Sequence, residues 1–130
     1  MSKSLGNGLD PLELVTEYGA DALKFTLAFL CAQGQDILID RESFKLGSKF
    51  ANKIWNASRY ILMNLEGRNL VENPALLPVD RWIYSRLDYA AAAIADALEG
   101  YRYNEAAQAA YEFFWNDFCD WYVEATKLSL

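Results

Sequence analysis

Apolar side chains recur every three or four positions over three long stretches, and this spacing constrains the fold more than any other feature of the sequence. The stretches cover residues 41–66, 79–100 and 105–127. A period near 3.6 residues places such side chains along one face of an α-helix. The sequence therefore predicts three long helices that pack as an up-and-down bundle with their apolar faces together. We expect Gly100 to end the second of these helices and Asn104 to cap the third.

Two shorter helices are predicted ahead of the bundle. Asp10 followed by Pro11 is typical of a helix start, because Asp caps free amide groups and Pro fits the first helical position. Gly19 then separates "PLELVTEY" from "ADALKFTLAFLCA", which we expect to form a buried helix over residues 20–32. The predicted fold class is all-α.

The run "DILID", residues 36–40, is the one strand-like segment in the sequence. A lone strand leaves its backbone groups unpaired. We therefore expect at most one short strand, which is either extended loop or has its partner in sequence outside this chain. Residues 67–78, with two prolines, are predicted to be a linker.

Histidine is absent from all 130 residues. This excludes histidine acid–base chemistry, histidine metal sites and histidine-dependent triads, and no metal site is predicted. Cys31 and Cys119 lie far apart in the sequence, which favours reduced thiols over a disulfide. No apolar run is long enough to span a membrane. We expect a cytoplasmic protein without a membrane partner.

The charge pattern leaves room for a local nucleic-acid contact. The net charge of −6 argues against a general nucleic-acid binder, yet nine of the twelve basic residues lie between positions 41 and 102. Four of them recur every four residues on the polar side of the first long helix. Such a ridge suits the phosphate backbone of an RNA stem, and an ordinary solvated helix face is the alternative. The predicted RNA-binding residues are Arg41, Lys45, Lys49 and Lys53.

Aromatic residues crowd the last predicted helix, but carboxylates are interleaved with them. Rings on RNA-binding surfaces stack on bases, whereas carboxylates repel phosphate. We therefore predict that these rings form core, and that Asp117, Asp120 and Glu124 form solvated surface. The rings are those of Tyr111, Phe113, Phe114, Trp115, Phe118, Trp121 and Tyr122.

The chain opens with Ser2-Lys3-Ser4, followed by a glycine-spaced turn. A lysine ammonium between hydroxyls suits phosphate oxygens, although these three residues alone favour an ordinary solvated terminus. The wider segment "MSKSLGNGLDPLELVTEYGADALKFTLA" resembles the Lys-Met-Ser-Lys-Ser signature loop of class I aminoacyl-tRNA synthetases and the helices that follow it. "NKIWN", "DRWIYSRL" and "FWNDFCDWY" resemble the valyl branch best, and the isoleucyl and leucyl branches share the layout.

The resemblance implies a segment of an enzyme that activates valine with ATP and Mg²⁺ and transfers it to tRNA(Val). Residues 1–40 would be the signature loop and a stem-contact segment, and residues 41–130 part of the helical anticodon-binding domain. Lys3 would be catalytic, binding ATP phosphates together with Ser2 and Ser4. We expect the segment alone to bind no cofactor and to be inactive, because it would lack the nucleotide-binding fold and the histidine-containing first signature of the family. A stand-alone helical RNA-binding or interaction module remains the alternative from a different class.

Overall fold

The computed structural model describes residues 8–32, 34, 39–69 and 71–127, and all regular structure within these ranges is helical. The elements are α1 (Pro11–Tyr18), α2 (Ala20–Leu30), the 3₁₀ turn η2 (Arg41–Phe44), α3 (Lys45–Leu65), α4 (Pro78–Glu99), α5 (Tyr103–Glu112), the π-helical η3 (Phe113–Val123) and α6 (Glu124–Thr126). The predicted all-α class is confirmed.

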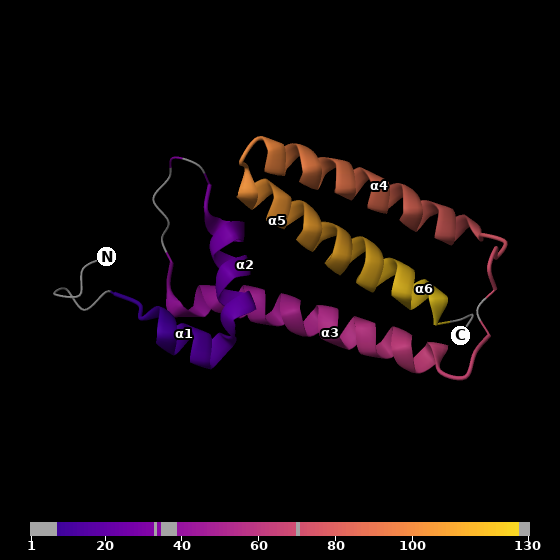
Figure 1. The fold of residues 1–130 in the computed structure, drawn as a ribbon, viewed down its shortest axis with the longest axis horizontal. Coiled ribbons are helices and arrows are strands. Elements are labelled where there is room, and N and C mark those ends of the chain that lie inside the picture. Colours follow the sequence, from indigo (N-terminus) through magenta and orange to yellow (C-terminus); the bar gives the residue numbers. More distant parts are fainter. Residues whose placement is uncertain (1–7, 33, 35–38, 70, 128–130) are drawn as a thin grey trace.

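The long helices run alongside one another, with the continuous helix α5–η3–α6 between α3 and α4 (Figure 1). Helix α2 packs against both α3 and α5, and α1 packs against α2. None of the helices in the described ranges is both long and apolar enough to cross a lipid bilayer.

Local sequence sets the helix starts as predicted. The Asp10 carboxylate accepts a hydrogen bond from the backbone N–H of Leu12 at 2.9 Å, and Pro11 occupies the first turn of α1. Gly19 joins α1 to α2 with a φ of 91°, which a residue with a side chain rarely adopts. Asp40 caps η2, because its carboxylate accepts from both the N–H and the hydroxyl of Ser43.

The predicted strand run is only partly described. Ile39 and Asp40 belong to no strand, and the rest of the run lies outside the described residues.

The tightest packing lies where α2 crosses the start of α3. Phe44 is 2 % exposed and Thr26 is fully buried. The N–H of Gly47 donates to the Thr26 hydroxyl oxygen over 3.2 Å. A Cβ atom at Gly47 would stand 2.3 Å from the carbonyl oxygen of Ala22, so the two helices approach as closely as glycine allows.

An aromatic cluster connects this crossing to the last helix. The Phe50 ring lies 4.6 Å from that of Phe25 on α2 and 5.0 Å from that of Tyr111 on α5, measured between centroids. It also meets the Phe114 ring edge-on at 5.9 Å. The predicted domain boundary at residue 40 stays a prediction. These ring contacts join residues from both sides of that boundary.

The apolar face predicted for residues 41–66 is buried over its first half and keeps half-buried Ala57 and Ile61 further along, so that prediction is wrong only for its exposed residues. Leu62 is 67 % exposed, Leu65 41 % and Ile54 39 %. Helix α2 covers the start of α3, whereas further along the half-buried residues are Ala57, Tyr60, Ile61 and Asn64. The contact face of α3 is therefore rotated from the face that the apolar spacing indicates.

The last helix differs from the predicted single α-helix in two ways. It begins at Tyr103 after a left-handed Tyr101, so the predicted capping role of Asn104 is wrong. Residues 113–123 are π-helical, a wider coil than the α-helix. The predicted aromatic core is confirmed for the half-buried rings, while Trp121 is 69 % exposed.

Candidate nucleic-acid interface

Helix α3 carries four cations and no carboxylate in 21 residues. This contrasts with a chain that holds 18 acidic residues and a net charge of −6. A helix of such composition is a local basic surface on an acidic protein, which is the electrostatic requirement for contact with a phosphate backbone.

Arg41 does not lie on that surface. It precedes α3 in η2, and its guanidinium reaches α1, where it forms ion pairs with Glu13 at 2.7 Å and with Glu17 at 3.4 Å. Arg41 therefore links η2 to α1.

Lys45 and Lys49 lie on one side of α3 next to α2 and α5. Together with Leu30 and Tyr111 they line an open hollow of about 540 Å³. Lys45 forms an ion pair with Glu42, which raises the pKa of its ammonium. Lys49 is exposed and forms no ion pair within the described ranges, so its charge is available to a ligand.

Lys53 faces the last helix. Its ammonium lies 3.0 Å from the Asp120 carboxylate and 4.9 Å above the centre of the Trp115 ring. The structure thus brings Lys45 and Lys49 together and directs Arg41 and Lys53 to other neighbours. The aromatic and acidic residues interleaved in the last helix were the sequence signal for a partner of Lys53.

Of the carboxylates predicted as solvated surface, Asp120 and Glu124 are exposed as predicted, whereas Asp117 is half-buried, and each of the three has an ion-pair partner. Asp117 pairs with Arg86 of α4 at 2.7 Å, Asp120 pairs with Lys53, and Glu124 pairs with Lys127 at 2.5 Å. No group of three or more potential metal ligands occurs in the part of the chain that the structure describes.

Both cysteines carry free thiols, as predicted. Cys119 is buried and Cys31 is half-buried, and burial raises the pKa of the Cys119 thiol. The predicted ATP-binding residues Ser2, Lys3 and Ser4 lie outside the described residues.

Tyr122 connects η3 to the start of α4, and this contact yields a stability prediction. Its hydroxyl donates to Asp80 at 2.9 Å, and Asp80 also accepts from the N–H of Leu77 at 2.8 Å. We expect Tyr122→Phe to lower the free energy of unfolding by about 1.5 kcal/mol, the loss of one hydrogen bond to a charged group. Urea denaturation at pH 7 measures this, with the exposed Tyr84→Phe as a control expected to have little effect.

The same contact predicts a pH dependence. Burial and Asp80 raise the pKa of Tyr122 to about 12. In the unfolded chain a tyrosine titrates near pH ~10. The contribution of Tyr122 is therefore complete below about pH 10 and is lost as the pH rises towards 12. An equal stability difference between wild type and Tyr122→Phe at pH 7 and pH 11.5 would contradict this assignment.

Comparison with known proteins places the chain in a class. Residues 1–40 match the family model described as tRNA synthetases class I (I, L, M and V), and residues 80–130 match the anticodon-binding domain of tRNA ligase. Together with the all-helical fold, these matches show that the chain belongs to the class I aminoacyl-tRNA synthetases.

Its relatives narrow the assignment to one family. The chain is 63 % identical over 131 residues to the valine–tRNA ligase of Treponema pallidum and 65 % identical over 136 residues to that of Treponema denticola. The valine–tRNA ligase of Thermotoga maritima is 57 % identical over 127 residues. These alignments cover 98–99 % of this chain and 14–15 % of the relatives. The chain thus belongs to the valine–tRNA ligase family, and it spans about one seventh of the length of these relatives.

Proposed function

We propose that this chain serves, as part of a valine–tRNA ligase, in the ATP-dependent attachment of valine to tRNA(Val). The observation that carries the proposal is identity of 57–65 % to three such ligases over nearly the whole chain. The two free thiols are compatible with work in the cytoplasm.

Residues 1–40 are proposed to take part in the activation of valine. Lys3 would place a positive charge against the phosphates of ATP, and Ser2 and Ser4 would contact the same phosphates. A fixed cation stabilises the charge that develops on those oxygens as the adenylate forms. ATP would enter with Mg²⁺, which neutralises further phosphate charge.

The helical part is proposed to bind the backbone of the tRNA through the cations Arg41, Lys45, Lys49 and Lys53. Lys49 can do so directly, since it forms no ion pair within the described ranges. Arg41, Lys45 and Lys53 would have to exchange a carboxylate for a phosphate. The acidic balance of the chain opposes binding at long range, so we expect only weak binding by the isolated chain.

The test is binding of a tRNA(Val) transcript across a salt series by wild type and by a Lys45→Ala/Lys49→Ala/Lys53→Ala variant. Each phosphate contact that is lost should lower the slope of log affinity against log salt by about 0.7–0.9. Alanine preserves helix propensity, and circular dichroism verifies that the helices persist. An unchanged slope would exclude these lysines from the tRNA contact.

A further inference from the structure

The exposed side of α3 carries a row of hydrogen-bond donors that continues beyond Lys49. Asn52, Asn56 and Arg59 follow Lys49 at three, seven and ten positions, the spacing that keeps side chains on one face of a helix. All four residues are exposed. At 1.5 Å per residue the row is about 15 Å long.

No acidic side chain of α3 interrupts the row, and its two cations are not neutralised by neighbours. Neither Lys49 nor Arg59 forms an ion pair within the described ranges. The row therefore presents hydrogen-bond donors and positive charge with no negative charge, and each asparagine amide can also accept a hydrogen bond. A surface of donors with two free cations suits a ligand made of acceptors, and the phosphate and ribose oxygens of RNA are such acceptors.

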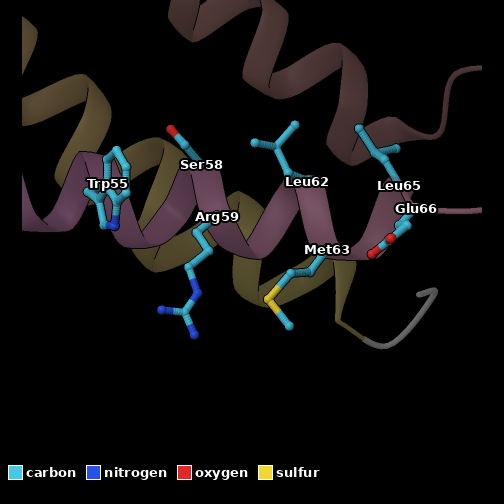
Figure 2. A pocket seen from close by; sticks show the side chains of 7 residues that line it. All are labelled: Trp55, Ser58, Arg59, Leu62, Met63, Leu65 and Glu66. Carbon is cyan, nitrogen blue, oxygen red and sulfur yellow. The ribbon is translucent and has the colours of Figure 1, made fainter.

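Trp55 lies beside this row and is 70 % exposed. It borders an open hollow of about 580 Å³ along the outside of α3, whose lining also includes Arg59, the apolar side chains of Leu62, Met63 and Leu65, and the carboxylate of Glu66. Figure 2 shows Trp55 and Arg59 standing out from the helix surface beside this hollow. Aromatic rings and guanidinium planes are the groups on which proteins stack unpaired RNA bases.

We infer that Lys49, Asn52, Trp55, Asn56 and Arg59 form an RNA-binding surface, with the row on the sugar–phosphate backbone and Trp55 against a base or ribose. This rests on the proposed function, and it assigns Asn52, Trp55, Asn56 and Arg59 to a site built so far on lysines. It also gives Trp55 a role, because a large exposed ring beside donors without partners among the described residues is poorly explained by packing within this chain.

The experiment uses the 130-residue chain and a fluorescent tRNA(Val) transcript, with anisotropy measured between about 50 and 200 mM salt. Arg59→Ala should reduce the salt slope by about 0.7–0.9. Arg81→Ala is the matched control, because Arg81 is an exposed helical arginine of α4 that forms no ion pair within the described ranges. Both variants change the net charge equally, so only a contact distinguishes them.

Two neutral variants test the other members of the surface. Trp55→Leu should weaken binding about tenfold without changing the salt slope, because stacking releases no counterions. The Asn52→Ala/Asn56→Ala double variant should also weaken binding at a constant slope. Alanine has the higher helix propensity, so unfolding of α3 would not explain that loss.

The outcomes distinguish a failure of this inference from a failure of the proposed function on which it rests. If the triple lysine variant loses affinity while the Arg59, Trp55 and paired asparagine variants bind like wild type, the function stands and this surface is overturned. Equal slopes for Arg59→Ala and Arg81→Ala would also overturn it, since only the overall charge would matter. Failure of the wild type to bind the transcript at any salt concentration would overturn both. Sedimentation that reveals a dimer abolished by Trp55→Leu would instead assign the surface to a second copy.

Discussion

Gly47→Ala is expected to destabilise the protein by about 3 kcal/mol, although alanine is the better helix former. In an open helix this change would stabilise by about 1 kcal/mol. Here the new Cβ would lie 2.3 Å from the Ala22 carbonyl oxygen, 2.6 Å from the Thr26 hydroxyl oxygen and 2.9 Å from the Ala22 Cα. Two of these atoms are backbone, so relief requires that α2 and α3 move apart, and overpacking of this kind costs a few kcal/mol.

Chemical denaturation and thermal melting measure the effect, and Gly100→Ala is the matched control. At Gly100 an added Cβ would meet only the end of the flexible Arg102 side chain, which can rotate away with the loss of its exposed ion pairs to Asp96 and Glu105. The control should therefore change stability by less than about 1 kcal/mol. A Gly47→Ala variant as stable as wild type would mean that α2 and α3 are not in contact at this glycine.

Lys3→Ala should slow formation of valyl-adenylate by roughly 10²–10³-fold in a full-length ligase that contains this segment. This is the usual cost of removing one group that stabilises charge in the transition state. Valine-dependent ATP–pyrophosphate exchange measures this step without tRNA. Lys24→Ala is the control, because Lys24 is an exposed lysine that also lies within residues 1–40.

The pattern across two assays identifies the role of Lys3. Exchange should fall in Lys3→Ala while tRNA affinity stays normal, and the α3 variants should show the reverse. The 130-residue chain alone is expected to show no exchange. A full-length Lys3→Ala enzyme with normal exchange, or exchange catalysed by the isolated chain, would remove Lys3 from its assigned role.

Local chemistry predicted the helix boundaries wherever a residue has one strong preference. Asp10 and Pro11 start α1, Gly19 separates α1 from α2, and Gly100 ends α4. These signals act over a few residues and need no information about the rest of the fold. The capping role predicted for Asn104 is wrong because the left-handed Tyr101 reverses the chain ahead of it, so that α5 begins at Tyr103. The residue type gives no signal for a left-handed tyrosine.

The spacing of residues along the sequence did not predict which residues form ion pairs in the folded protein. The periodicity of residues 41–66 placed Arg41, Lys45, Lys49 and Lys53 on one ridge, but a helical wheel does not show what lies opposite each residue. Asp120 is 67 positions away from Lys53, and Glu13 is 28 positions away from Arg41. Such pairs follow from the packing of the helices. The sequence therefore predicted which basic residues are present but not which neighbouring element each of them contacts.

The π-helical stretch η3 has an evolutionary consequence. Asp117 and Asp120 are three residues apart, which in an α-helix would leave them about 60° apart, on nearly the same side. The wider coil turns by only roughly 80° per residue, so the two carboxylates diverge, and Asp117 reaches Arg86 of α4 while Asp120 reaches Lys53 of α3. The loss of one residue here would rotate every side chain beyond the deletion by about 80–100°. Selection should therefore preserve the length of this segment as strictly as its composition.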